Sequence, residues 1–405
     1  MKNFIKFIIL LALNACAHEA GELSSSSSDP ISAQESVRIA TFNVSMYRQA
    51  KADLISALFD SNDDQILAVA EIINTVDPDI LLINEFDYDK HGKSLNLFQT
   101  NYLKNRFGYS YVAPSNTGVS SGFDLNNDGA IVTEPGAFGY AGDAFGFGDF
   151  EGQYGFAIVS KFPIDTDNVR TFQNFLWKDM PDNLIPIEWY SHEERNVLRL
   201  SSKNHVDAPI RIGDKTVHII AAHPTPPTFD GPEDRNGKRN HDEIRLIADY
   251  ITPEIGGYLV DDNGKDGGLA KHAQFVIMGD MNADPNDGDS YNHAIRQLLS
   301  HERIAKVSPQ SSGAVAAAKI AAGANTEHIS PHANDTADFR DINDDGTNAV
   351  GNLRLDYVLP SNNLNVVASG VFWPADGEDG YNLVGPGYPP VSSDHRLVWI
   401  DVKID

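Results

Sequence analysis

Residues 274–284 read QFVIMGDMNAD. An apolar run that ends in Gly and polar turn formers predicts a buried β-strand. The polar end of this strand presents a carboxylate, Asp280, and a carboxamide, Asn282, on a rigid scaffold, where the two groups can aim and activate one water molecule. Alone the pattern is weak, because Asp and Asn after Gly are also ordinary turn residues.

Other expected strands also end in polar side chains. They are residues 38–44, which contain Asn43; residues 79–84, followed by Glu85; residues 217–222, followed by His223; and residues 355–359, which contain Asp356. Asp394 and His395 directly precede the last expected strand, residues 397–402. Each of these side chains alone is most simply explained as a turn residue that satisfies backbone groups. Their combination calls for another explanation.

The order Asn, Glu, His, Asp-x-Asn, Asp, Asp-His resembles that of the endonuclease/exonuclease/phosphatase family, the deoxyribonuclease I-like metal-dependent phosphoesterases. The matching stretches are TFNV, INEFD, AAHP, GDMNAD, LDYVL and SSDH, spread from residue 41 to 395. Strands and helices without strict alternation already indicate an α+β fold. The resemblance implies a four-layer α/β/β/α sandwich of two mixed β-sheets flanked by helices, with the active centre at one end.

The resemblance also implies a role for each matching residue. Phosphoester hydrolysis needs a metal ion, an aimed water molecule and donors for the transition-state oxygens. We expect Glu85 to be the main ligand of catalytic Mg²⁺ (or Mn²⁺), with Asp394 as a second metal residue and Asn43 holding the carboxylate or the phosphate. We expect Asp280 to orient and deprotonate the attacking water and Asn282 to fix the phosphate.

Two further matches concern histidines. Asp356 and His395 resemble the Asp-His pair of the family, in which the carboxylate orients the imidazole and stabilises its cationic form beside the phosphate. His223 is expected to contact a non-bridging oxygen. The chain departs from several family nucleases at Ser45, where they carry an Asp that helps to hold metal. This difference weakens a two-metal proposal.

Composition ranks the substrates. The formal net charge is −26, and 41% of the residues are hydrophobic. A strongly acidic chain argues against general affinity for polyanions, because binding to a phosphate backbone relies on Lys and Arg. We therefore favour a phosphomonoesterase or phosphodiesterase acting on small or lipid-derived organophosphates over an extracellular nuclease, although a local basic groove would reverse this order. A calcium-stabilised surface binding module without catalysis is the alternative from another class, and the complete set of site residues speaks against it.

The N-terminus predicts export. Two lysines in the first six residues and an apolar stretch, too short to span a bilayer, precede Cys16, the single cysteine of the chain. This resembles a lipoprotein signal in which Cys16 is lipidated, so we expect a cell-envelope lipoprotein held at a membrane. The alternative is an A-x-A cleavage site at residues 15–17 and a secreted or periplasmic soluble protein. The expected segments are a signal peptide at 1–16, a flexible Ser-rich tether at 17–36 and a catalytic domain at 37–405.

Local patterns predict elements around the site. Apolar spacing predicts a helix over residues 65–75, stopped by Asp77-Pro78. A β-hairpin is expected over residues 209–222, with its turn at 213–215. Residues 240–243 fit a capping box ahead of a surface helix, which places residues 224–240 in a long loop.

Three arginines are candidates for substrate binding. Arg235 or Arg239 would clamp a second phosphate oxygen, and the alternative is a loop held by its own ion pairs. Arg195 precedes a strand and would be a phosphate donor, but an exposed salt bridge to the adjacent glutamates fits equally well.

Two further segments carry patterns with open alternatives. Residues 136–156 interleave Gly with aromatic residues, which is typical of an aromatic rim for an apolar or aromatic leaving group or of a self-packed loop. Two loops space oxygens as in EF-hand calcium sites but lack the bidentate Glu at position twelve, so plain Asx turns explain them equally well. The candidate residues for structural Ca²⁺ are Asp124, Asn126 and Asp128 in one loop and Asp341, Asn343 and Asp345 in the other.

Overall fold

The structure is a computed structural model that describes residues 36–340, 349–385 and 390–404. Cys16 lies outside these residues, so lipidation and export stay predictions from the sequence. The second predicted calcium loop, with Asp341, Asn343 and Asp345, also lies outside the described residues. Within the described ranges, every helix is too short or too polar to span a bilayer.

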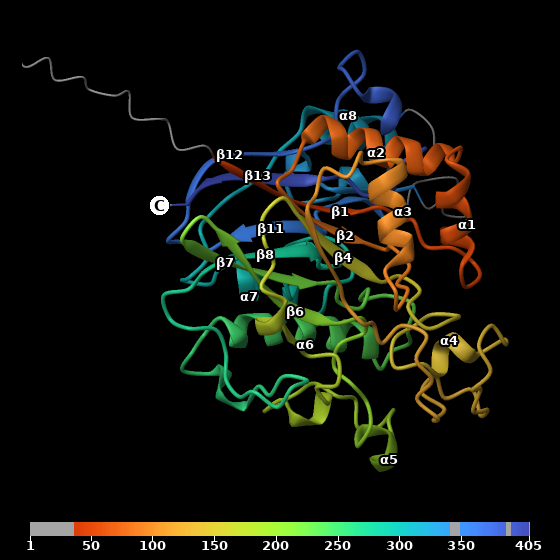
Figure 1. The fold of residues 1–405 in the computed structure, drawn as a ribbon. Coiled ribbons are helices and arrows are strands. Elements are labelled where there is room, and N and C mark those ends of the chain that lie inside the picture. Colours follow the sequence, from red (N-terminus) through yellow and green to blue (C-terminus); the bar gives the residue numbers. More distant parts are fainter. Residues whose placement is uncertain (1–35, 341–348, 386–389, 405) are drawn as a thin grey trace, which may run out of the picture. The chain divides into compact units, whose positions relative to one another are not determined.

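The first β-sheet has six strands (Figure 1). In spatial order they are β12 (Asn365–Val371), β13 (Val398–Lys403), β1 (Val37–Asn43), β2 (Ile80–Asn84), β4 (Phe156–Ser160) and β3 (Tyr109–Val112). β1 and β2 run parallel, with Asn43 beside Asn84. The other neighbouring pairs are antiparallel, so the sheet is mixed, as predicted.

The second sheet has five strands. They are β11 (Asp356–Pro360), β8 (Gln274–Asp280), β7 (Lys215–Ala222), β6 (His205–Ile212) and β5 (Arg170–Thr171). β7 and β8 run parallel, whereas β11 runs antiparallel to β8 and starts with Asp356 opposite Asp280. The predicted hairpin is β6–β7, closed by Gly213 and Asp214, with Gly213 at a φ of 63°. A separate ribbon pairs β9 (Ala337–Phe339) with β10 (Gly351–Leu353).

Helices cover the outer faces of the two sheets. The α-helices are α1 (Asp53–Asp60), α2 (Asp64–Val76), α3 (Lys93–Asn101), α4 (Tyr140–Asp143), α5 (His192–Arg195), α6 (Arg235–Tyr250), α7 (Arg296–Leu299) and α8 (Ser312–Ala321). Short 3₁₀ helices are η1 (Thr166–Asn168), η2 (Trp177–Asp179), η3 (Gly256–Tyr258), η4 (Tyr291–His293), η5 (Gly323–Thr326), η6 (His332–Asn334) and η7 (Tyr381–Leu383). Figure 1 shows α2 on the outer side of the first sheet and α6 on that of the second.

The alternation of side chains along β8 explains the layers. Val276 and Met278 belong to the core between the two sheets, which also takes residues from β1, β2 and α2. Phe275 and Ile277 point to the opposite face and pack in the core under α6. Because successive strand residues face opposite sides, one strand that is apolar throughout serves two cores. The four-layer α/β/β/α sandwich is therefore confirmed.

Helix boundaries agree with the prediction in one case and not in another. α2 begins after Asp63, whose side chain accepts the Ile66 N–H, and ends at Asp77 in a left-handed conformation, close to the predicted limits. α6 begins at Arg235 and not after Asn240, so the predicted capping box is wrong. The Asn240 side chain is buried and donates to the carbonyls of Thr225 and Met281. Its polar group thus fixes the loop after β7 and does not cap a helix.

Gly279 allows β8 to approach the end of β7. Its φ is 146°, and a Cβ atom added there would lie 1.9 Å from the carbonyl oxygen of Ala222. Only glycine fits such a close backbone approach. The glycine therefore brings the segment that carries Asp280 next to His223.

We predict that Gly279→Ala destabilises the protein by roughly 2–4 kcal/mol, because the new methyl group must displace the backbone of β7. Gly257→Ala is the matched control, since a Cβ atom there meets no atom within 4 Å. Chemical denaturation of both variants measures the change. Equal stability of the two variants would contradict this description of the β7–β8 contact.

Candidate active site

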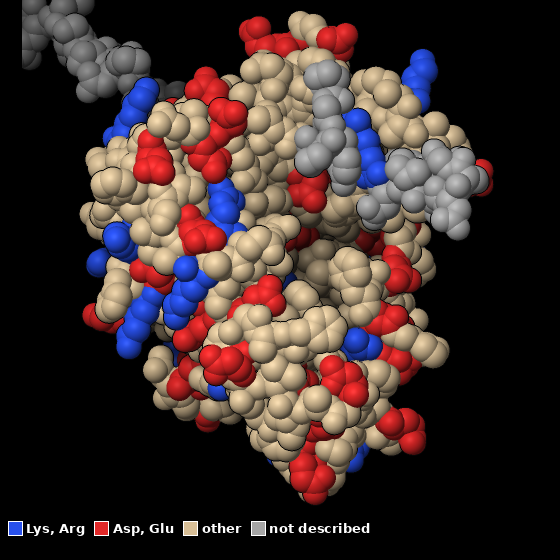
Figure 2. Space-filling model, turned by 90° about the vertical axis from the view of Figure 1, so that its right-hand side faces the viewer, with Lys and Arg blue, Asp and Glu red and all other residues tan. Residues whose placement is uncertain are grey.

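The predicted polar residues meet where the two sheets end. β1, β7 and β8 finish at this edge and β11 starts at it, because β11 runs antiparallel to β8. Figure 2 looks onto a face of the molecule with a hollow that shows acidic side chains in its depth. The residues brought together are Asn43, Glu85, His223, Asp280, Asp356, Asp394 and His395.

One amide joins the two sheets at this point. The Nδ2 atom of Asn43, from the first sheet, donates to Glu85 Oε1 and to Asp280 Oδ2, both at 3.0 Å. Its Oδ1 atom accepts the N–H of Ser45 at 3.1 Å, which fixes the orientation of the amide. Asn43 is fully buried, so these bonds form in a medium that strengthens them.

Asp280 is the central carboxylate. It is 1% exposed, and its Oδ1 atom accepts the N–H of Asn282 at 2.9 Å. Its Oδ2 atom lies 3.4 Å from Nε2 of His223 and 3.8 Å from Nε2 of His395. The Nδ2 atom of Asn282 donates to the carbonyl of Pro224. The predicted role of Asn282 in binding the phosphate stays a prediction.

Asp356 and His395 form a buried pair. His395 Nδ1 lies 2.8 Å from Asp356 Oδ2, which also accepts the hydroxyl of Thr336. Burial raises the pKa of Asp356 to about 6, although His395 opposes the shift. Burial lowers the pKa of His395, but the charges of Asp356 and Asp280 outweigh it and raise this pKa well above the usual range. At neutral pH the pair is therefore imidazolium and carboxylate.

The donor set around Glu85 fits a divalent cation. Ligand atoms of Glu85, His223 and Asp280 all lie within 4.8 Å of one another. Burial, followed by the charge of Asp394, raises the pKa of Glu85 to about 7. Carboxylates that repel each other in a buried site are stabilised by a hard cation, which prefers oxygen ligands. Ser45, the position of the family departure, donates its hydroxyl to Asp394 Oδ1 at 2.6 Å and so positions this carboxylate.

His223 is a neutral imidazole, in contrast to the cationic His395. It is 2% exposed, and its Nδ1 atom has no hydrogen-bond partner among the described residues. Burial, together with the charges of Lys203 and His395, lowers the pKa of His223 well below the usual range. A neutral imidazole at this place can donate one N–H to a bound oxygen.

Lys203 belongs to the site but was not predicted. Its side chain is almost completely buried just before β6. Burial lowers the pKa of Lys203, whereas the charges of Glu243, Glu85 and Asp280 raise it. A lone lysine in the polar run 201–204 gives no local signal of function. Only the approach of β6 to the site reveals it.

The three arginines predicted to bind the phosphate make contacts within the protein. Arg239 is 9% exposed, and its guanidinium donates to the carbonyls of Leu200, Phe145 and Arg199. It holds loops together, so the predicted phosphate clamp does not fit it. Arg235 pairs with Glu233 and lies over the Trp189 ring, which agrees with the ion-pair alternative. Arg195, in the exposed helix α5, donates to the carbonyl of Ser191.

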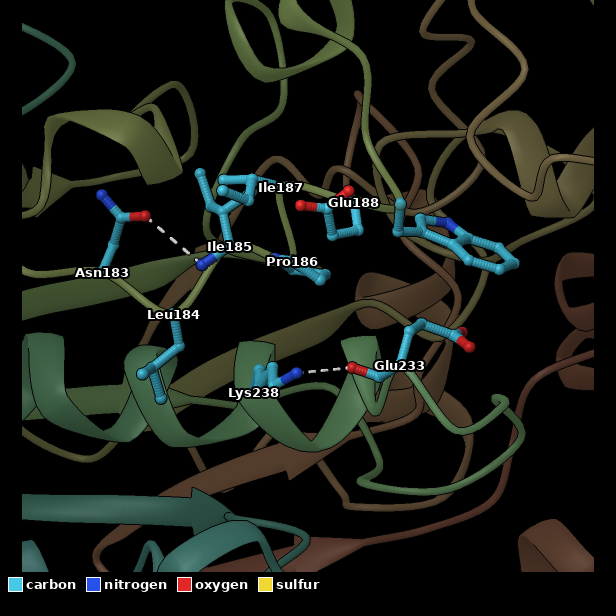
Figure 3. Close-up of a pocket in the computed structure, with 9 residues that line it drawn as sticks. Asn183, Leu184, Ile185, Pro186, Ile187, Glu188, Glu233 and Lys238 are labelled. Carbon is cyan, nitrogen blue, oxygen red and sulfur yellow. Dashed lines mark hydrogen bonds between the residues drawn. The ribbon is translucent and has the colours of Figure 1, made fainter.

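A separate cavity of about 440 Å³ lies beside the start of α6 (Figure 3). Residues 183–189 form one wall, and Glu233 and Lys238 form the other. Lys238 Nζ donates to the carbonyl of Glu233, as Figure 3 shows. The carboxylates and histidines of the candidate site are not among its lining residues, so this cavity is distinct from the site.

The remaining predicted segments are mostly self-contained. Within residues 136–156, Tyr140, Phe145, Phe150 and Phe156 are buried, whereas Phe138 and Phe147 are exposed. The loop is therefore largely self-packed.

In the first predicted calcium loop the carboxylates contact their own backbone. Asp124 accepts the N–H groups of Asp128 and Gly129, and Asp128 accepts that of Ala130. The Asn126 side chain donates to Asp128 Oδ2 and accepts the Asp128 N–H. Asx turns explain these contacts, and calcium binding stays a prediction.

Comparison with known proteins agrees with the fold. An endonuclease/exonuclease/phosphatase protein from Beutenbergia cavernae is similar at a TM-score of 0.50, with 16% identity over 91% of this chain and 72% of that chain. A family protein from Leptotrichia buccalis has a TM-score of 0.45 and 14% identity, over 91% of this chain and 100% of that chain. Sphingomyelinase C from Streptomyces griseocarneus has a TM-score of 0.42 and 13% identity, over 90% of this chain and 99% of that chain. The similarity to the Beutenbergia cavernae protein, at 16% identity, concerns the fold alone. No curated protein sequence matches the chain.

The family model described as Endonuclease/Exonuclease/phosphatase family matches residues 40–395. This range contains every residue of the candidate site. Members of the family are hydrolases, mostly metal-dependent phosphoesterases. The chain belongs to the endonuclease/exonuclease/phosphatase family.

Proposed function

We propose that this protein is a metal-dependent hydrolase that cleaves phosphoester bonds in small or lipid-derived organophosphates, as a phosphomonoesterase or phosphodiesterase. The observation that carries the proposal is the buried carboxylate of Asp280, which accepts a hydrogen bond from the same Asn43 amide as Glu85. This carboxylate lies close to two histidines, of which His223 is neutral and His395 is cationic. Groups with such different environments are suited to separate tasks in one reaction.

Glu85 would hold the divalent cation, Mg²⁺ or Mn²⁺, with Asp394 and Asn43 supporting it. The grouping of ligand atoms from Glu85, His223 and Asp280 and the raised pKa of Glu85 support a cation beside Glu85. When bound, the ion neutralises charge that develops on the phosphate oxygens. Asn43 keeps Glu85 at a fixed place through its 3.0 Å bond.

Asp280 would orient and deprotonate the attacking water. Its two oxygens are held by the Asn282 N–H and the Asn43 amide, so the carboxylate is fixed in one orientation. A water molecule on Asp280 would be aimed at phosphorus without the cost of ordering the base. General-base action requires the charged oxygen and not only the shape of the side chain.

Cationic and neutral donors would bind the phosphate. The imidazolium of His395, held by Asp356, offers positive charge beside Asp280. Neutral His223 would donate one N–H to a non-bridging oxygen, and Lys203 would add charge from the β6 side. Fixed donors of this kind stabilise transition-state oxygens because they need no reorganisation.

Surface charge supports a small substrate over a nucleic acid. Figure 2 shows uncharged side chains around most of the hollow, with acidic groups in its depth and basic groups scattered over the face. A continuous basic stripe, which binding along a phosphate backbone would need, is not visible on this face. A nuclease is therefore the second candidate.

We predict that Asp280→Asn lowers kcat by about two orders of magnitude or more, the usual scale of general-base catalysis. The amide keeps the size of the side chain, so substrate affinity and thermal stability should change little. Steady-state kinetics on 4-nitrophenyl mono- and diesters with Mg²⁺, together with thermal melts, measure both effects. Asp289→Asn, at an exposed position, is the control. A folded Asp280→Asn protein with turnover near that of the wild type would refute the proposed mechanism.

We also predict that chelation abolishes hydrolysis and that added Mg²⁺ or Mn²⁺ restores it. The same ions should raise the melting temperature of the metal-free protein, because a ligand that binds only the native state stabilises it by mass action. Glu85→Gln should lose both the thermal shift and the activity. Full turnover in excess chelator would exclude a metal requirement.

A further inference from the structure

Two tyrosines lie beside the metal end of the candidate site. Tyr47 follows β1 and Tyr154 precedes β4, and their ring centroids are 4.5 Å apart at an interplanar angle of 44°. Both rings are partly exposed. The catalytic roles proposed above use neither of them.

Contacts of neighbouring residues place Tyr154 near Glu85 and Tyr47 near Asp394. Phe86, which directly follows Glu85, donates its N–H to the carbonyl of Gly155, the residue after Tyr154. Tyr47 lies two residues after Ser45, whose hydroxyl contacts Asp394. Burial and the charges of Glu85 and Asp394 raise the pKa of Tyr47, and burial, Tyr47 and Glu85 raise that of Tyr154. Both phenols therefore stay neutral beside the carboxylates.

Tyr154 has a strained backbone conformation that hydrogen bonds of neighbouring side chains stabilise. Its φ of 57° lies in the left-handed region, which is unusual for a bulky side chain. The Asp87 carboxylate accepts the N–H of Tyr154 at 3.1 Å and that of Arg48 at 2.8 Å. The Gln153 side chain adds a bond to the carbonyl of Arg48. Strain that the surroundings maintain is typical of a site that needs one fixed geometry.

The hydroxyls of Tyr47 and Tyr154 are not hydrogen-bonded to any of the residues that the structure describes, although many other partly buried polar groups are paired. The hydroxyls and the exposed parts of the two rings thus remain available to a ligand at the metal end of the site. An aromatic ring binds another planar ring by offset or edge contact in addition to area burial.

We propose that Tyr47 and Tyr154 form an aromatic platform that binds one planar organic substituent on the phosphorus, so that the preferred substrates are aryl or heteroaromatic phosphoesters. This inference rests on the proposed phosphoesterase function and defines its substrate class. It also gives a role to the strained conformation of Tyr154.

Binding of two matched phosphonates tests the platform without turnover. Phenylphosphonate has a planar ring, and cyclohexylphosphonate has a ring of similar size without a π face. In isothermal titration with Mg²⁺, the wild type should bind phenylphosphonate roughly 3- to 10-fold more tightly. Tyr47→Leu should lose this preference, whereas Tyr47→Phe, which keeps the ring, should retain it.

A second variant guards against misfolding. Tyr154→Asn removes the other ring, and Asn tolerates the left-handed conformation, so it too should lose the preference while thermal melts show a folded protein. Equal binding of the two phosphonates by the wild type, no binding of phenylphosphonate, or an undiminished preference in both ring-deletion variants would overturn the platform. Failure of the phosphoesterase function is a separate result, because it appears as absence of ester hydrolysis by the same wild-type preparation.

Discussion

The amide of Asn43 is the contact on which the site depends. It binds one carboxylate that follows a strand of its own sheet, Glu85, and one that ends a strand of the other sheet, Asp280. Two buried carboxylates side by side repel each other, and each needs donors to stay charged. A single donor group shared between them therefore sets the distance between the place of the metal and the place of the base. Asn43 is fully buried and its Oδ1 atom accepts the Ser45 N–H, so its amide is held in one orientation between the two sheets.

Residues that follow apolar strands could be predicted from the sequence. A run of buried residues ends at, or is followed by, each of Asn43, Glu85, His223 and Asp280. The first polar residue after a buried strand lies at the edge of the sheet where that strand ends. The unbroken apolar run of β8 and the hairpin turn at Gly213 are local signals of the same kind. These local signals indicated an α+β fold and the polar strand ends, whereas the four-layer architecture and the roles of the site residues followed from the family resemblance.

Other features depend on contacts between distant segments, and the sequence gives no local sign of them. Lys203 directly precedes the segment that leads into β6, and only the folded structure brings its charge under the influence of Glu243, Glu85 and Asp280. Asn240 looked like a helix cap, yet tertiary bonds to Thr225 and Met281 place it inside α6. The sequence suggested Arg239 as a phosphate ligand. Its guanidinium instead donates hydrogen bonds to the backbone carbonyls of Leu200, Phe145 and Arg199. Local patterns cannot distinguish a polar group that serves a ligand from one that satisfies the backbone.

The central claim is that water held at Asp280 attacks phosphorus directly. The most direct test is a single turnover in ¹⁸O-labelled water with Mg²⁺, with enzyme in excess over an aryl phosphoester, followed by mass spectrometry of both products. Direct attack predicts one ¹⁸O atom in the phosphate product and none in the released alcohol. Label in the alcohol, or a phosphoryl group retained on the protein, would contradict the account.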